Sequence, residues 1–185
     1  MSDIPREVVI RGSRVALARF RESDIDAVHA FASDPVVCRF TGWGPNTLDE
    51  TRAFLTDAVR RSNDRYDLAV VRGDEVIGSA SVWTTSPVHR VGELGYTIRQ
   101  DCWGQGFATE VARLLVELGF AHLDLGRLSA TCDPANAASV RVLEKAGLRR
   151  EGLLRGLYFV RGRHRDRLMF GCLRTDIAET ATSGP

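Results

Sequence analysis

The chain has 185 residues, of which 44% are hydrophobic and 26% are charged, and these values are typical of one soluble globular domain. Its 25 basic and 24 acidic residues give a net charge of +1, which excludes a strong overall basic field for binding nucleic acid or an anionic membrane. The four cysteines form no Cys-x-x-Cys pair, so the sequence indicates neither a zinc site nor a disulfide framework.

Two strands and a helix are expected at the start of the chain. Val8–Ile10 and Arg14–Phe20 have the composition of strands and are separated by turn residues. Ser23 and Asp26 then have the spacing of a capping box, which predicts the start of a helix. This helix is expected to end near Asp34, which precedes a proline.

A second helix is expected after Thr47, because Thr47 and Glu50 have the pattern of a full capping box. The connection before it, Arg39–Pro45, is rich in glycine and carries Phe40 and Trp43. Two interpretations of these rings stay open. They belong to a lid or wall of a substrate site, or they pack into the bottom of the core.

Three strands follow the second helix. Their expected ranges are Asp67–Arg72, Val76–Thr84 and Val91–Arg99, and they are expected to be antiparallel because their connections are short. The third strand leads into a turn with two glycines. After that turn, apolar residues recur at helical spacing over Val111–Leu123.

The last part of the chain is expected to form one strand, one helix and a final pair of strands. Leu128–Cys132 is the strand, and Asn136–Ala146 is a helix that Gly147 closes. The final pair is Leu148–Tyr158 and Arg165–Leu173. The mixed order of helices and strands argues for one α+β domain over residues 1–174, with a mainly antiparallel sheet and a short polar tail at residues 175–185.

The turn with Gly104 and Gly106 is a candidate anion site. Glycine lets a ligand approach the backbone closely, and the first amides of the following helix carry the positive end of its dipole. A P-loop would need Gly-Lys-Ser/Thr where Phe107 and Ala108 stand, and a dinucleotide fingerprint would need a small residue at Thr109, so neither fits well. The alternative is an ordinary turn in which the glycines only close the loop.

Two motifs in this half of the chain are similar to those of a known family. The first is WGQGFATE at Trp103–Glu110, and the second is DPANAASVRVLEKAGL at Asp133–Leu148. Together they resemble the GNAT superfamily of acyl-CoA-dependent N-acetyltransferases, most closely its RimJ/RimL-like branch, and the resemblance extends from Val15 to about Arg174. It implies the GNAT fold, an α+β arrangement in which a mixed, mainly antiparallel sheet is flanked by helices and splays between its two central strands.

The resemblance also implies acetyl-CoA as the cosubstrate and no metal. In the family, the glycine turn holds the diphosphate of coenzyme A, and the preceding strand pairs with the pantetheine arm. Asp101 departs from the family pattern, so no side-chain contact with the diphosphate is expected at that position. The residues expected to bind the cofactor are Tyr96, Thr97, Ile98, Trp103, Gly104, Gln105, Gly106, Phe107, Ala108, Thr109, Asn136 and Ser139.

Two residues are candidates for catalysis of acetyl transfer to an amine. Ser139 matches the Asn-x-x-Ser motif of the family and is the candidate general acid, because Leu143 replaces the tyrosine that many relatives place on this helix. The alternative is a serine that satisfies a backbone amide near a helix N-terminus. Glu93 is the candidate general base, directly or through water, and the alternative is an exposed carboxylate paired with Arg90 or Arg99.

We therefore expect an N-acetyltransferase that moves the acetyl group directly to a primary amine in a ternary complex, because no activated cysteine dyad is visible. The acceptor is a protein N-terminal α-amine or a small-molecule amine, and the sequence does not choose between them. The alternative function is a non-catalytic acyl-CoA-binding or sensing module, which the leucine at Leu143 favours.

The expected partners are acetyl-CoA and the amine acceptor, without nucleic acid or membrane, and a homodimer is one option. A cytoplasmic location is expected because the chain has neither a hydrophobic signal region nor an apolar run that could span a bilayer. Arginines concentrate near the end of the chain, where we expect them on solvated strand faces or at the rim of a dimer. They are Arg149, Arg150, Arg155, Arg161, Arg163, Arg165 and Arg167.

Overall fold

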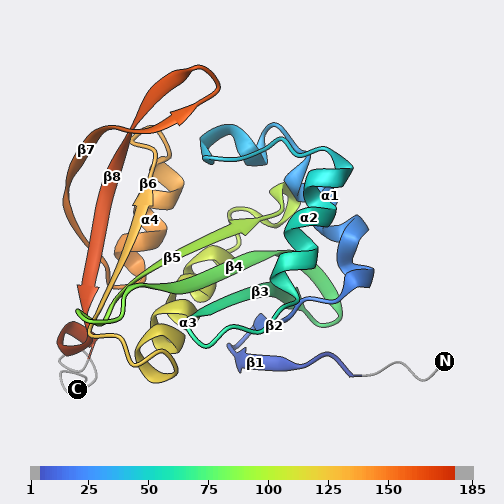
Figure 1. The fold of residues 1–185 in the computed structure, drawn as a ribbon, viewed down its shortest axis with the longest axis horizontal. Coiled ribbons are helices and arrows are strands. Elements are labelled where there is room, and N and C mark those ends of the chain that lie inside the picture. The colour runs from blue at the N-terminus through green and yellow to red at the C-terminus, as the bar shows by residue number, and fades with distance from the viewer. Residues whose placement is uncertain (1–4, 178–185) are drawn as a thin grey trace.

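A computed structural model describes residues 5–177, which form one mixed sheet of eight strands with helices on both faces (Figure 1). The strands are β1 (Val8–Arg11), β2 (Ala16–Arg19), β3 (Arg65–Arg72), β4 (Glu75–Ser86), β5 (Val91–Ile98), β6 (Arg127–Cys132), β7 (Arg149–Val160) and β8 (Arg163–Leu173). Their order in the sheet is β1-β2-β3-β4-β5-β6-β8-β7, and all pairs are antiparallel except β5 with β6. The expected α+β class and the mainly antiparallel sheet are confirmed.

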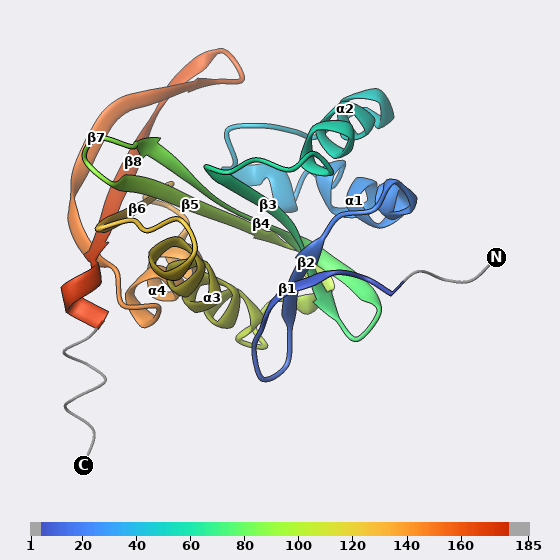
Figure 2. The same cartoon turned by 60° about the horizontal axis from the view of Figure 1, so that its bottom comes forward.

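Four α-helices cover the sheet, two on each face (Figure 2). The helices are α1 (Ile25–Ala32), α2 (Leu48–Ala58), α3 (Phe107–Ala121) and α4 (Ala137–Lys145), and short 3-10 turns lie at Glu22–Asp24, Val37–Phe40 and Gln100–Cys102. Within residues 5–177, no helix combines the length and apolarity needed to cross a membrane. Of the expected polar tail at residues 175–185, residues 175–177 belong to a helical turn that starts at Arg174, and residues 178–185 lie outside the described part.

The alternation of side chains along the strands builds two cores from one sheet. On β3, Leu68 and Val70 point into the core that α3 and α4 cover, whereas Ala69 and Val71 point into the core that α1 and α2 cover. All four side chains are buried. This two-sided burial explains why β3 reads as a continuous apolar run in the sequence.

The sheet splays between β5 and β6. Their parallel ladder has three residue pairs, which join Val91–Glu93 to Arg127–Ser129. Beyond Glu93, β5 stays paired with β4 and β6 stays paired with β8, but no described strand pairs with residues 94–98 on the β6 side. Figure 1 shows the two strands leaving their common end in different directions. The expected splay is confirmed.

The first helix begins about where it was expected, but the expected capping pair is wrong. The capping interactions before α1 involve Arg21 and Asp24, because the Asp24 carboxylate accepts the Arg21 amide at 2.8 Å. Asp24 is buried and also accepts two hydrogen bonds from the Arg6 guanidinium, at 2.8 and 2.6 Å. This buried pair links two distant segments, so the helix entry follows Asp24 and not the Ser23–Asp26 spacing. The second expected box, Thr47 with Glu50, is confirmed in both directions.

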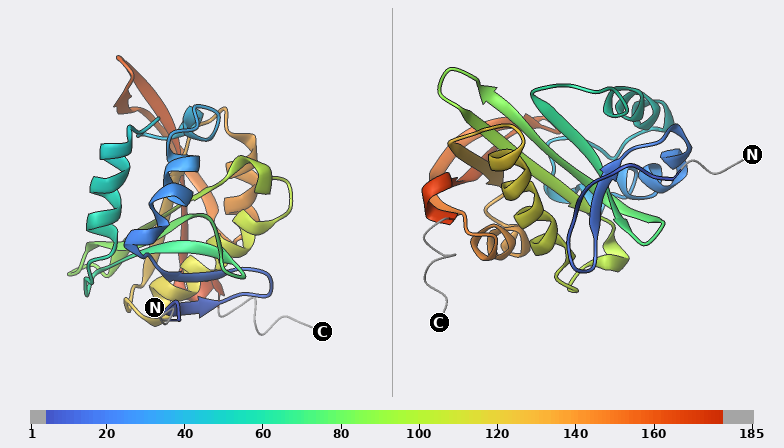
Figure 3. Two further views of the ribbon diagram at one scale, coloured as in Figure 1. Left: turned by 90° about the vertical axis from the view of Figure 1, so that its right-hand side faces the viewer. Right: turned by 90° about the horizontal axis from the view of Figure 1, so that it is seen from below.

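The β7–β8 hairpin reaches across the molecule to the connection between α1 and α2, as Figures 1 and 3 show. The contact is made by Arg161 at the hairpin turn. Its guanidinium donates hydrogen bonds to the carbonyl oxygens of Cys38, Gly44 and Trp43, at 2.8, 2.7 and 3.3 Å. The connection is therefore held over the end of the sheet where β5 and β6 are apart.

Candidate active site

The glycine turn opens α3 and leaves its first amides without a side-chain cap. Gly104 and Gly106 have φ of +73° and +83°, a region that favours glycine, and Gly106 is the N-cap of α3. A Cβ at Gly104 would have no atom within 4 Å, so the space above this residue is open. The turn therefore presents uncapped amides and a helix dipole toward an open volume, which fits the diphosphate of coenzyme A.

Arg14, which the sequence analysis missed, adds a positive charge beside this turn. Its guanidinium donates to the Gln105 carbonyl oxygen at 2.7 Å and lies over the Phe107 ring, with 5.1 Å from Cζ to the ring centroid. The Glu110 carboxylate holds this residue through the Arg14 amide and Nε, at 2.8 and 3.1 Å. Because these residues are more than 90 positions apart, no local pattern could have indicated the pairing.

Asp101 is the carboxylate nearest to the turn in sequence, and it is occupied by an ion pair. The Arg99 guanidinium donates to both Asp101 oxygens, at 2.6 and 2.8 Å, and also to Glu75 at 2.6 Å. These bonds hold the Asp101 side chain on Arg99. The expectation that Asp101 makes no diphosphate contact stays a prediction.

A groove of about 1560 Å³ runs from the glycine turn along β5. It is lined by both motifs, and among the residues expected to bind the cofactor only Gln105 is not part of its wall. The Gln105 side chain instead donates to the Asp101 carbonyl oxygen at 3.1 Å. The Trp103 indole closes one position of the free strand edge, because its Nε1 donates to the Ile98 carbonyl oxygen at 2.7 Å.

Ser139 faces β5 across the groove. Its hydroxyl lies 3.1 Å from the Tyr96 hydroxyl, and either oxygen can be the donor. Its backbone amide is satisfied separately by the Asn136 side-chain oxygen at 3.1 Å, which makes Asn136 the N-cap of α4. The alternative in which the Ser139 hydroxyl serves as a helix cap is therefore wrong.

The Tyr96 side chain is a functional candidate that the sequence analysis missed, because it considered only the backbone there. Burial raises the pKa of the Tyr96 hydroxyl, and the hydrogen bond with Ser139 opposes this shift. The hydroxyl is therefore neutral, and it can donate a hydrogen bond to Ser139. Leu143, at the position where many relatives have a tyrosine, is buried in the core, whereas the Tyr96 hydroxyl on β5 lies beside α4 at Ser139. The alternation of Tyr96 with Leu94 and Ile98 indicates on which side of the strand its side chain lies, but not its hydrogen bond to Ser139.

Glu93 is half-buried in the groove at the point where β5 and β6 separate. Burial raises the pKa of its carboxyl, and the positive charge of Arg167 opposes the shift. The alternative pairing with Arg90 or Arg99 is wrong, because Arg90 binds Asp124 at 2.6 Å and Arg99 binds Asp101 and Glu75. A carboxylate with a raised pKa in a groove is a candidate general base.

Arg167 does not lie on a solvated strand face as expected. Only 8% of it is exposed, and it donates to the carbonyl oxygens of Phe40 and Thr131 at 2.9 and 3.3 Å. The loop that it holds, Arg39–Pro45, lines the groove with Phe40 and Trp43, and 41% of Trp43 is exposed. The rings therefore form a wall of the groove rather than a plug of the core.

Comparisons with known proteins agree with this geometry. The family described as "Acetyltransferase (GNAT) domain" matches residues 14–149, which is more than half of the chain. The uncharacterized N-acetyltransferase p20 of Bacillus licheniformis is 31% identical over 173 residues, which cover 89% of this chain and 96% of that protein.

Solved structures show the same fold. A GNAT-family acetyltransferase from Bacillus anthracis superimposes with a TM-score of 0.81 at 27% identity, over 89% of this chain and 97% of that one. RimL, a ribosomal L7/L12 α-N-protein acetyltransferase solved in complex with coenzyme A, has a TM-score of 0.80 at 18% identity, over 90% and 98% of the two chains, and shows the fold alone. On the domain match and the whole-length relative, this chain belongs to the GNAT family of acetyltransferases.

Proposed function

We propose that this acetyltransferase moves the acetyl group of acetyl-CoA directly to a primary amine, with both substrates bound in one groove. The observation that carries the proposal is the arrangement along β5. The uncapped glycine turn, the free strand edge, the Tyr96–Ser139 pair and the Glu93 carboxylate line a single continuous groove.

The residues present fit acetyl-CoA, which supplies the acetyl thioester. The amides at Gly106 and in the first turn of α3, together with Arg14, would hold the diphosphate. The backbone of β5 over residues 94–98 has no strand partner on the groove side and would pair with the pantetheine arm. Free amides on the same edge would donate hydrogen bonds to the carbonyl oxygen of the acetyl group.

Glu93 and Ser139 would handle the two protons of the reaction. The Glu93 carboxylate would accept a proton from the acceptor ammonium, directly or through water, and burial raises its pKa toward that of an amine. Ser139 Oγ would donate a proton toward the sulfur that leaves, and the Tyr96 hydroxyl would replace that proton through their hydrogen bond. The acceptor nitrogen loses two protons between the ammonium and the amide. Glu93 would pass the first to solvent before the attack and accept the second as the tetrahedral intermediate forms, and this second proton is matched by the proton given to sulfur. Exchange with solvent would then remove the proton from Glu93 and return one to the Tyr96 oxygen.

Direct transfer is favoured because the cysteines near the groove are poor nucleophiles. Cys102 and Cys132 are buried, and burial raises the pKa of both thiols. A neutral thiol does not attack a thioester well, because the thiolate is the nucleophile. All four cysteines are free and buried, which is compatible with the cytoplasmic location that we propose for the reaction.

Within the family we propose the RimJ/RimL-like branch, on the strength of the two sequence motifs. A protein N-terminal α-amine is the favoured acceptor class, because its pKa of about 7.7–8.0 is closer to that of a carboxylate base than the value of about 10.4 for a lysine-type amine. The rival function, a non-catalytic acyl-CoA sensor, rested on the leucine at Leu143. The Tyr96 hydroxyl removes that argument.

The test is release of free thiol from acetyl-CoA against N-terminal peptides, polyamines and amine antibiotics, with coenzyme A binding measured by calorimetry on the same sample. We expect binding and amine-dependent thiol release, with the peptides as the best substrates. Binding without release from any acceptor would support the sensor. Absence of binding would refute both functions.

A further inference from the structure

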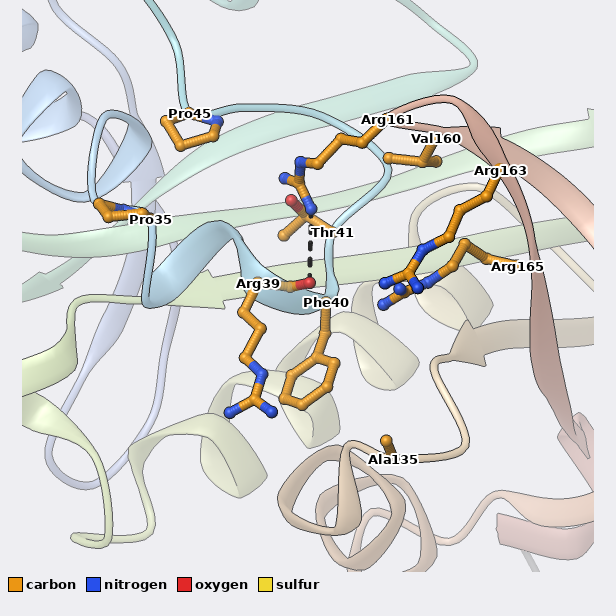
Figure 4. A pocket seen from close by; sticks show the side chains of 10 residues that line it. All are labelled: Pro35, Arg39, Phe40, Thr41, Pro45, Ala135, Val160, Arg161, Arg163 and Arg165. Carbon is orange, nitrogen blue, oxygen red and sulfur yellow. Dashed lines mark hydrogen bonds between the residues drawn. The ribbon is translucent and has the colours of Figure 1, made fainter.

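A second cavity, of about 490 Å³, lies at the outer end of the groove between the Arg39–Pro45 connection and β8 (Figure 4). It shares Arg39, Phe40, Thr41, Ala135 and Val160 with the groove wall, so the two spaces adjoin. Its remaining wall is dominated by arginine. A molecule that extends from the groove past these shared residues would place its outer groups in this cavity.

Four guanidinium groups border the cavity, and none of its lining residues is acidic. Arg163 and Arg165 lie two residues apart on β8 and thus share one face, and Figure 4 shows their side chains running together into the cavity. Arg39 belongs to the opposite wall, but Figure 4 shows its side chain running away from Arg163 and Arg165, with its guanidinium against the Phe40 ring at 5.0 Å.

The four arginines differ in what already binds them. The Arg161 guanidinium donates hydrogen bonds to the carbonyl oxygens of the Arg39–Pro45 connection and of Cys38, and Arg165 forms an ion pair with Asp133 at 3.0 Å. Arg163 and Arg39 have no carboxylate partner among residues 5–177. Two like charges converge at Arg163 and Arg165 with only one carboxylate between them, so the cavity keeps a net positive charge.

We infer that this cavity binds a carboxylate carried by the amine acceptor. A guanidinium pairs with a carboxylate through two parallel hydrogen bonds, and an anion bound by Arg163 would relieve the repulsion between Arg163 and Arg165. The acceptor is thus an amine with an acidic group close to it, such as an N-terminus followed by acidic residues. A polyamine is disfavoured, because its second cation would lie against arginines.

This inference deepens the proposed function and rests on it, so its first test does not depend on turnover. The probes are N-acetylated and C-terminally amidated tripeptides with two aspartates or two asparagines, so that only the side chains differ in charge, titrated onto the protein saturated with coenzyme A. The aspartate peptide is expected to bind, and Arg163→Glu is expected to weaken this binding by about tenfold or more, the effect of one lost charge-assisted hydrogen bond. Arg155→Glu, an exposed β7 residue outside the cavity, is the matched control and should change nothing.

Equal binding of the two peptides, or an unchanged affinity in Arg163→Glu, would overturn the inference. A second arm uses β-alanine and phosphoethanolamine as competitors of the aspartate peptide. Stronger competition by phosphoethanolamine would also overturn it, because the cavity would then be a phosphate site.

Turnover separates this inference from the proposed function. Thiol release is expected to be fastest with peptides that carry acidic residues after the N-terminus, slower with amide versions and slowest with lysine versions. Equal rates for the three would refute the carboxylate site and leave the transfer standing. Acidic peptides that bind but release no thiol would refute the transfer and support the carboxylate site.

Discussion

Replacing Tyr96 by phenylalanine tests the proton relay most directly. The change removes one hydroxyl and keeps the ring, so it deletes the 3.1 Å hydrogen bond to Ser139 with little loss of packing. A net hydrogen bond contributes about 0.5–1.5 kcal/mol, and the domain is expected to stay folded. The turnover number should fall about 100-fold to 10,000-fold, because general acid catalysis contributes about 3 to 5 kcal/mol to lowering the barrier.

The assay is steady-state thiol release at saturating acetyl-CoA, with coenzyme A affinity measured by calorimetry. Affinity should stay within about twofold, since the hydroxyl acts on the leaving sulfur and not on the diphosphate. Tyr66→Phe is the matched control, because Tyr66 is also half-buried on the sheet but packs against Arg19 and His122 away from the groove.

The proposed relay also predicts the activity of a double variant that combines Tyr96→Phe with Ser139→Ala. If Tyr96 acts through Ser139, then Ser139→Ala alone and the double variant should lose similar factors, because residues of one unit are not additive. Two single losses that multiply in the double variant would show independent roles. A turnover number for Tyr96→Phe above half of the original value would refute the reasoning entirely.

Three further changes test other parts of the site. In the unchanged enzyme, kcat/KM should fall as the pH drops through the pKa of Glu93, because the protonated carboxyl cannot accept a proton, and burial places this fall above the usual carboxyl range. Glu93→Gln should lower kcat/KM about 100-fold or more and abolish this acidic fall. An unchanged pH profile in the variant would exclude Glu93 as the base. Gly106→Val should abolish the binding of coenzyme A measured by calorimetry, because φ is +83° and the new side chain would meet the Arg14 guanidinium. The control is Gly73→Val, where φ is +62° and the surrounding space is open. It should keep coenzyme A binding despite a similar backbone strain of about 1–2 kcal/mol. Arg161→Ala should remove the hydrogen bonds that hold the Arg39–Pro45 connection. We expect KM for the amine to rise about threefold to tenfold while the affinity for coenzyme A stays constant. A constant KM would show that this connection does not shape the acceptor site.

Most of the fold could be predicted from the sequence because its signals are local. The strands alternate, α3 has a helical apolar period, and Gly147 closes α4 with φ of +93°. The short connections correctly indicated antiparallel neighbours. What failed was the capping pair of α1, where the buried pair of Arg6 with Asp24 overrides the local Ser23–Asp26 pattern.

The candidate site was predictable where a motif spans it and not where it depends on distant partners. The positions of Gly104, Gly106 and Ser139 follow from the two motifs, and the structure brings them to one groove. Arg14 and the Tyr96 hydroxyl gain their roles only through residues 96 and 43 positions away. The burial of Arg167 could not be predicted either. A run of arginines on a strand indicates a solvated face, and only the fold shows that the Arg39–Pro45 connection packs over Arg167.

The splay also gives the sheet an edge in its interior. An ordinary edge strand lies at the rim and can accept another polypeptide, but the free edge of β5 is enclosed between two half-sheets. The opening is a wedge, which starts near the glycine turn at Ile98 and closes where the ladder begins at Glu93. A linear ligand that enters from the turn reaches the paired residues of β5 and β6, so we expect the closed end of the wedge to limit the length of the acyl chain. We expect acetyl-CoA to outperform butyryl- and longer acyl thioesters in the thiol-release assay, and equal rates would show that the ladder opens.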